Sequence, residues 1–430
     1  MTNKKPNELT ALEALTRIKA GSLTSEALVE ACLQRVSERE KTVGAWKFIS
    51  PDQARKTARN VDNGTTDRPL CGVPIGVKDL FDTVDMPTSY GSPIYEGNRP
   101  SSDASAVART RVSGGVILGK TITTEFSLFE PGKTTNPHNP NHTPGGSSSG
   151  SAAAVADCMV PLALGSQSVG STIRPASYCG VVGYKPSFGL VDCSGIRPLI
   201  WSFDTVGVFS RSVSDAAYFI SILSRRQALR LEGNLETPPR IGFCRTPEWS
   251  LADQDTENVL KTAARLATAS GAQVRDITLP EPFPKLAHAQ GVIADFEVAN
   301  SAAYELTFHR DLLSRKFVER ADAGVELTIE QYDEALSIVA AAQAGLDSAM
   351  DDVDVLLCPS ATGEAPEGLG ATGDPIFNRL GTALRVPCVN IPGLSGHSGL
   401  PVGVQVIGRM MDDRRTLAVG EWLHNILKSE

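Results

Sequence analysis

Residues 145–171 read GGSSSGSAAAVADCMVPLALGSQSVGS, and twelve of these 27 residues are glycine or serine. This composition is typical of a flexible linker. Here, however, the serines flank a run of alanine, valine, methionine and leucine that is too apolar to lie in water. The stretch is therefore predicted to be a folded part of the protein, and its serines are candidates for chemistry.

Outward from this stretch, short apolar runs bounded by glycine and proline predict strands at 72–77, 116–118, 181–182, 355–357 and along the alternating residues Val402, Val404 and Val406. Helical spacing of apolar residues predicts two helices within 8–45 and single helices near 212–224, 253–270 and 328–350. Strands interleaved with helices indicate the α/β class.

Composition narrows the classes of protein further. The 41 Lys and Arg against 49 Asp and Glu give a net charge of −8, which argues against a nucleic-acid partner. No apolar run reaches the roughly 18 to 20 residues that cross a bilayer, so we expect no membrane span and a cytoplasmic location. The eight cysteines are dispersed and no phosphate-cradle motif is present, so neither a metal nor a cofactor is expected.

Two kinds of serine chemistry fit the glycine-serine stretch. Residues 146–150 read GSSSG, the pattern of a nucleophile elbow at Ser148, with His309, His397 and His424 following in the chain order of an α/β-hydrolase. Alternatively, a lysine can activate a serine if burial keeps its amine neutral near pH 7. Lys78 ends an apolar, strand-like run and is suited to that role.

Five long motifs occur in order: GVPIGVKD at 72–79, NPHNPNHTPGGSSSGSAAAVA at 136–156, LGSQSVGSTIRPASYCGVVGYKPSFG at 164–189, DTVGVFSRSVSDAA at 204–217 and GLPVGVQVIG at 399–408. In these motifs the chain resembles the amidase signature family, most weakly between about 225 and 350. The resemblance implies a single large α/β/α domain with a mixed central sheet flanked by helices. It also implies an amidohydrolase that cleaves a linear amide through an acyl-enzyme and releases ammonia or a small amine.

A chain of 430 residues suggests two or three domains by length alone, and the polar segment 226–250 is a first guess for a linker. The motifs, however, spread the catalytic residues and their support from 72 to 408, which favours one amidase domain over 1–430. Within it we expect N-terminal helices at 1–70, a catalytic core at 71–225, a variable elaboration at 226–350 and a C-terminal return to the sheet at 351–430.

By position, the family's Ser-cis-Ser-Lys triad corresponds to Lys78 as base, Ser147 as bridging serine and Ser171 as nucleophile. The separation of 24 residues between the two serines matches the family's usual spacing. The resemblance implies a cis peptide at Ser147. It also implies an oxyanion hole made by the backbone amides of Ser168, Val169, Gly170 and Ser171.

Three residues near Ser171 differ from the family's usual sequence. Gln167 stands in place of an acid and Val169 in place of a glycine, so the backbone at Val169 is either free of strain or differently shaped. Arg174 lies three residues after Ser171 instead of two, which is similar to malonamidase-like members. We hypothesise that its guanidinium, if turned inward, clamps a carboxylate of a small amide substrate through two parallel hydrogen bonds, unless an internal acid pairs with it.

The expected partner is therefore a small-molecule amide, and we also expect a homodimer. A second function stays open, the glutaminase-type subunit of an amidotransferase, in which the same triad supplies ammonia to a partner protein.

Overall fold

The computed structural model describes residues 4–64, 67–128, 130–233 and 235–429. Eleven strands form one sheet in the order β1-β3-β2-β4-β6-β5-β10-β11-β9-β7-β8. The strands are β1 (Trp46–Ile49), β2 (Pro74–Lys78), β3 (Val116–Thr121), β4 (Leu162–Gln167), β5 (Val182–Lys185), β6 (Thr205–Ser210), β7 (Arg240–Cys244), β8 (Gln273–Ile277), β9 (Val355–Pro359), β10 (Cys388–Ser395) and β11 (Pro401–Ile407).

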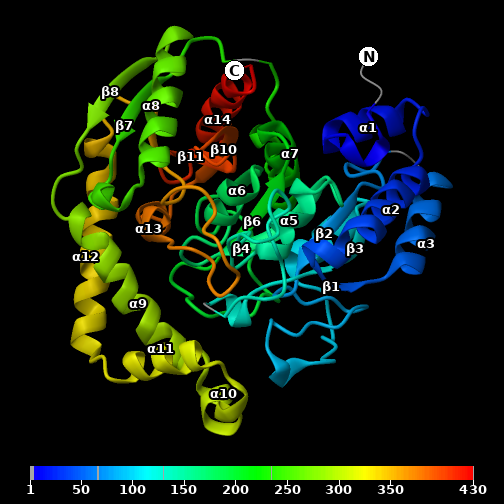
Figure 1. The fold of residues 1–430 in the computed structure, drawn as a ribbon, viewed down its shortest axis with the longest axis horizontal. Coiled ribbons are helices and arrows are strands. Elements are labelled where there is room, and N and C mark those ends of the chain that lie inside the picture. The colour runs from blue at the N-terminus through cyan, green and yellow to red at the C-terminus, as the bar shows by residue number, and fades with distance from the viewer. Residues whose placement is uncertain (1–3, 65–66, 129, 234, 430) are drawn as a thin grey trace.

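Helices flank this sheet and extend beyond one end of it (Figure 1). They are α1 (Ala11–Lys19), α2 (Ser25–Val43), α3 (Pro51–Asp62), α4 (Ser105–Val112), α5 (Ser149–Ala156), α6 (Ile173–Cys179), α7 (Val213–Leu223), α8 (Gln254–Ala269), α9 (Leu286–Ser301), α10 (Ala303–Phe308), α11 (Arg315–Val325), α12 (Ile329–Ala349), α13 (Ile376–Ala383) and α14 (Asp413–Leu427). None of the helices in the described part of the chain is long and apolar enough to cross a membrane.

The sheet is mixed. β2 pairs in parallel with both β3 and β4, and β7 pairs in parallel with β8 and β9, whereas the strands between β4 and β9 pair antiparallel. The predicted single α/β domain with a mixed sheet is confirmed.

The helices predicted from apolar spacing are all present, and polar side chains set where they begin. The hydroxyl of Thr10 accepts a hydrogen bond from the Glu13 N–H at the start of α1, and the Asp253 carboxylate does the same for Thr256 in α8. Such caps satisfy backbone donors that the first helical turn leaves unpaired. The predicted strands also appear, as β2, β3, β5, β9 and β11.

Residues 226–350 contribute more to the fold than an insertion would. β7 lies within the polar segment 226–250 that was suggested as a linker, and β7 and β8 form one end of the common sheet. Further on, α9, α11 and α12 pack together into a helical lobe at the lower left of Figure 1. Part of the suggested linker is therefore a strand of the same sheet, and the finer division at 70, 225 and 350 stays a prediction.

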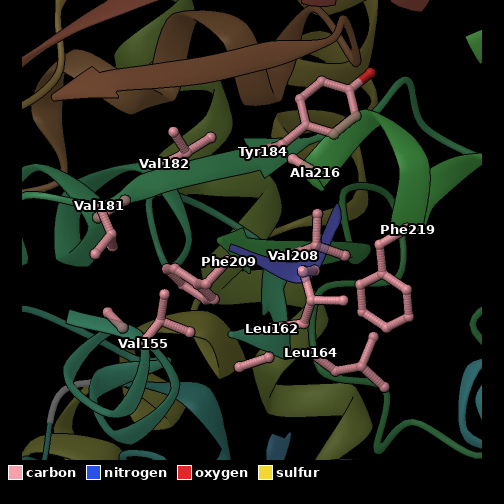
Figure 2. Packing of buried hydrophobic residues seen from close by; sticks show 14 of the residues in the cluster. Val155, Leu162, Leu164, Val181, Val182, Tyr184, Val208, Phe209, Ala216 and Phe219 are labelled. Atoms are coloured by element: carbon pink, nitrogen blue, oxygen red, sulfur yellow. The ribbon is translucent and has the colours of Figure 1, made fainter. Parts of the chain in front are cut away.

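The two largest buried apolar clusters hold the parts together. The larger lies along the sheet, where Figure 2 shows Leu162 and Leu164 of β4 and Val208 and Phe209 of β6 packed with neighbouring side chains such as Phe219 of α7. The second joins the helical lobe to the sheet and contains side chains from α9, α11, α12 and β9. This second cluster also includes Ile173, two residues after Ser171, so the lobe packs beside the proposed nucleophile.

Candidate active site

The carboxyl ends of β2 and β4 bring the predicted catalytic residues together. These two strands are parallel neighbours, with Val77 opposite Leu164. The segments that follow the two strands therefore leave the sheet at the same edge. Lys78 is the last residue of β2, and the loop 168–171 follows the end of β4. Because ligands in open α/β sheets bind beyond the carboxyl ends of the strands, this edge is the expected place for a site.

Lys78 is completely buried, and its Nζ lies 2.7 Å from Ser147 Oγ and 2.8 Å from Ser166 Oγ. Burial lowers the pKa of Lys78 well below its usual range, because the charged ammonium is poorly solvated there, and the charge of Asp204 raises the pKa in part. A lysine in this setting is suited to act as a neutral base.

Ser147 sits at the start of α5 in a tight turn. The peptide bond between Gly146 and Ser147 is cis, as the resemblance implies. Gly145 has a φ of +79°, and a Cβ on this residue would lie 2.7 Å from the Cα of Pro175. Glycine at 145 therefore serves both the backbone conformation and the close packing of α6 against the turn.

In the loop 168–171, which carries Ser171, the backbone carbonyls accept hydrogen bonds from other parts of the protein, whereas most of the backbone N–H groups have no acceptor among the residues that the structure describes. Each carbonyl accepts a hydrogen bond: Ser168 from Gln290 Nε2 at 3.2 Å, Val169 from Thr382 Oγ1 at 2.6 Å, Gly170 from Arg174 N at 3.1 Å and Ser171 from Ser148 N at 3.3 Å. Within the described residues, the N–H groups of Val169, Gly170 and Ser171 donate to no other atom. These amides are thus free to bind an oxyanion.

The two unusual residues of this loop have structural explanations. Gln167 Oε1 accepts hydrogen bonds from the N–H groups of Thr172 and Ile173 at 2.9 and 3.0 Å, and its Nε2 donates to Thr382 Oγ1 at 3.0 Å. Gln167 therefore replaces an acid without losing the acceptor at the start of α6. Val169 is not among the residues with positive φ, so its backbone is free of the strain considered above.

Arg174 is buried and lines a cavity of about 30 Å³ together with Ser168, Val169, Gly170 and Ser171. Its Nη2 donates to Gly146 O at 2.7 Å and to Thr372 Oγ1 at 3.1 Å, which leaves that nitrogen occupied. The hypothesised clamp of two parallel bonds is therefore not open to Arg174 in this structure, because both edges of a guanidinium that present two parallel donors include Nη2. Nε and Nη1, however, are buried without a hydrogen-bond partner, and no acid forms an ion pair with the guanidinium in the described residues.

The nucleophile-elbow hypothesis is wrong. Ser148 Oγ donates to Ser166 O at 3.2 Å, and none of the three histidines contacts it in the described part of the chain. His309 bonds Tyr304, and His397 pairs with Asp255 at 2.6 Å on the surface. His424 is buried, and desolvation lowers the pKa of its imidazole to about 3.

Two residues beside the predicted triad escaped sequence reasoning. Ser166 lies on β4 and is the second neighbour of Lys78, and the parallel pairing of β2 with β4 was the signal that could have placed it there. Asp204 opens the fourth quoted motif, and its carboxylate accepts a hydrogen bond from Ser168 Oγ. Its place beside the loop depends on how β6 lies against β4, which the motif alone does not reveal.

Comparison with known proteins agrees with this geometry. The family model described as "Amidase" matches residues 27–417. One subunit of the glutamyl-tRNA(Gln) amidotransferase of Natranaerobius thermophilus is 29% identical over 476 residues, covering 99% of this chain and 96% of that one.

Solved structures extend the likeness to the whole fold. A crystal structure of an amidase is 30% identical with a TM-score of 0.88, over 97% of this chain and 99% of that one. The native peptide amidase of Stenotrophomonas maltophilia is 27% identical with a TM-score of 0.83, over 97% and 96%. The chain therefore belongs to the amidase family and is a hydrolase of carbon–nitrogen bonds in amides.

Proposed function

We propose that Ser171 is the nucleophile, Ser147 the proton-relaying serine and Lys78 the base. Neutral Lys78 takes the proton of Ser147 while Ser147 takes that of Ser171, whose Oγ then attacks the amide carbonyl. The free N–H groups of the loop stabilise the oxyanion, and the relay runs in reverse to protonate the departing nitrogen. Water then hydrolyses the acyl-enzyme. The 2.7 Å separation of Lys78 Nζ from Ser147 Oγ supports this assignment.

The nucleophile assignment can be tested by covalent trapping. A fluorophosphonate probe is expected to add one label to the native enzyme, and peptide mass spectrometry is expected to locate it on Ser171. Ser171→Ala should stay unlabelled and inactive. Labelling at Ser148, or none in an active preparation, would exclude the assignment.

For the substrate, we propose a small amide that carries a carboxylate. The observation that supports it is that Arg174, which lines the same cavity as Ser171, has two buried donors without a partner, Nε and Nη1, on different edges of the guanidinium. Buried guanidinium donors without a partner are unfavourable by about 1–3 kcal/mol each, and a carboxylate oxygen would relieve this. The small cavity suits a small substrate. The likeness to malonamidase-type members rests on Gln167 and Arg174 alone, whereas the relatives named above are amidases and one amidotransferase subunit.

The cavity is basic beyond Arg174. Arg379 of α13 and Arg320 of α11 also line it, and Asp295 pairs with Arg320. Arg379 Nη1 donates to Gln290 Oε1 at 2.8 Å. Three guanidinium groups facing one cavity favour an anionic substrate over a neutral one.

Ammonia release from paired substrates tests this proposal. Malonamate, succinamate and glutamine carry a carboxylate, whereas propionamide and butyramide do not. Arg174→Ala is expected to raise KM for the first group by about 10-fold or more and for the second group much less, because a charge-assisted bond is lost only with the first. Equal losses for both groups would exclude the carboxylate subsite.

Thr372→Val is the matched control for Arg174. It removes one acceptor of Nη2 while keeping the guanidinium, so it reports the effect of loosening the side chain alone. Its effect on the two substrate groups should be equal.

A second function, as the ammonia-supplying component of an amidotransferase, is favoured by the likeness to the Natranaerobius thermophilus protein over nearly the whole length of both chains. Glutamine is itself an amide with a carboxylate, so Arg174 suits both functions. The purified chain is expected to release ammonia by itself at a rate independent of added proteins. Activity that appears only in a complex would instead favour this second function.

A further inference from the structure

Asp204 lies directly before β6 and joins two separate segments of the chain near the site. One oxygen of its carboxylate, Oδ1, accepts a hydrogen bond from Ser168 Oγ, and the other, Oδ2, accepts from the N–H groups of Leu199 and Ile200 at 2.9 and 3.2 Å. Ser168 opens the loop whose amides face the site. The carboxylate therefore anchors this loop to the segment 199–200.

A second, smaller cavity lies beside Asp204 and Ser166. Its volume is about 10 Å³, close to the minimum that holds one water molecule, and Ser166, Ser168 and Asp204 all line it. Ser166 Oγ is a direct neighbour of Lys78 Nζ, so one serine side chain connects the amine with the small cavity that Asp204 lines. Because this cavity has room for so little water, the screening of the interaction between the amine and the carboxylate is weak.

The other ionisable groups around this space already have partners. Asp79 pairs with Lys120 at 3.2 Å, Arg197 with Glu305 at 2.7 Å, and Glu297 accepts hydrogen bonds from Ser202 and Tyr332. Cys193 also lines the cavity, and burial raises the pKa of its thiol to about 12, so it stays uncharged. Asp204 is thus the carboxylate whose charge acts on Lys78.

We propose that Asp204 is a positioning residue of the active site, which fixes the oxyanion loop through Ser168 and acts on Lys78 through its negative charge. The inference rests on the proposed roles of Lys78 and Ser171. Its consequence is that a charge outside the triad offsets part of the effect of burial on the base, since an anion nearby favours the protonated amine. Burial also raises the pKa of Asp204 itself, to about 6, so the carboxylate carries its full charge only above that pH.

Asp204→Asn removes the charge and keeps an acceptor for hydrogen bonds. Without the anion the pKa of Lys78 falls further. The acid limb of the pH profile of kcat/KM is therefore expected to move to lower pH by about one unit. The plateau value of kcat/KM is expected to be lower, because Lys78 is then a weaker base. Ser168→Ala is the matched variant, since it removes the anchor and leaves the charge. It should lower kcat by about 10-fold or more without moving the limb.

Chemical rescue gives a readout that a purely structural role would not move. Asp204 also lines a larger cavity of about 520 Å³ whose rim includes the exposed side chain of Trp201, so a small anion can enter from the surface. Asp204→Ala is expected to lose activity and to regain about 10-fold with added formate. Formate should not activate the wild type or Ser168→Ala.

The outcomes separate the two levels of the proposal. An active Asp204→Asn with an unmoved acid limb, or an Asp204→Ala that formate does not restore, would overturn the charge role. An unchanged kcat in Ser168→Ala would overturn the loop role, even if the Asp204 variants do not fold. Failure of the proposed triad would appear elsewhere, as full activity in Ser171→Ala.

Discussion

Lys78 Nζ lies 2.7 Å from Ser147 Oγ at the end of β2, with both side chains buried. Within the described residues the hydrogen-bond neighbours of this amine are two hydroxyl groups and no carboxylate. An ammonium ion in such a place lacks both bulk water and a direct counter-ion, so the neutral amine is the form that the pair favours.

Lys78→Met is expected to lower activity by about 10²–10⁴-fold, the usual contribution of a general base. It should also change how stability depends on pH. In the wild type the native pKa of Lys78 lies below its unfolded value of 10.5, so between these values the unfolded chain binds one proton more than the native chain. Stability of the wild type therefore rises with pH through this window.

The measurement for this prediction is denaturant unfolding of both proteins from pH 7 to 10. The free energy of unfolding of Lys78→Met minus that of the wild type is expected to decrease steadily as the pH rises. Lys56→Met, at an exposed position, should give a flat difference. A flat difference for Lys78→Met as well would mean that the lysine is charged in the native state.

Ser166→Ala removes the second hydroxyl beside Lys78 Nζ. We expect a loss in kcat of about 10-fold, because the amine is less firmly oriented toward Ser147 when one of its two partners is missing. Ser149→Ala is a suitable control, since Ser149 Oγ has only a 3.5 Å contact with Ile122 O. Steady-state ammonia release decides the matter, and equal rates for Ser166→Ala and the control would count against the orienting role.

Gly170→Ala places a Cβ against Asn378 Oδ1 and 2.9 Å from the Cβ of Pro375. The loop must then shift away from α13, which displaces the amides that face the site, and a loss of kcat by about 10²–10³-fold is expected. Asn378→Ala in the same chain should recover part of the loss by making room. If the double variant is no faster than Gly170→Ala, steric displacement by Asn378 is not the cause.

His424 predicts an acid-sensitive fold. Desolvation lowers the pKa of this buried side chain to about 3 against 6.5 in the unfolded chain, so below pH 6.5 the unfolded chain binds the extra proton. Stability is therefore lost as the pH falls from 6.5 toward 3, by up to about 1.4 kcal/mol per pH unit. His424→Phe should flatten the pH dependence of unfolding over this range, whereas His288→Gln at the surface should leave it unchanged.

Much of the fold and the site could be predicted from the sequence. Apolar spacing predicted the helices α1, α2, α7, α8 and α12, and the resemblance carried by the ordered motifs predicted a mixed sheet with Lys78, Ser147 and Ser171 near one another. These features depend on the local pattern of residues and on motifs that occur in a fixed order along the chain. Beyond that, the joining of β7 and β8 to the same sheet could not be read, because strand order depends on contacts between distant segments.

The residues around the triad show the same limit. Ser166 and Asp204 owe their roles to which strand lies beside which, not to their own neighbours in the chain. The position of Arg174 in the sequence already marks it as unusual. Its hydrogen bond to Gly146 O, however, depends on how α6 packs against the turn at 145–147. The sequence therefore could not predict which nitrogens of the guanidinium lack a partner.

The order of strands in the sheet also constrains how the protein is made. The six strands from β1 to β6 are neighbours and are complete once residue 210 has been synthesised, but β7 and β8 reach the rest of the sheet only through β9, β11 and β10. Until residues 388–407 leave the ribosome, β5 has an unpaired edge, and β7, β8 and β9 are not joined to the strands from β1 to β6. A nascent chain of this protein therefore passes through a long stage with an open β edge, when binding by a chaperone or pairing with another chain competes with folding.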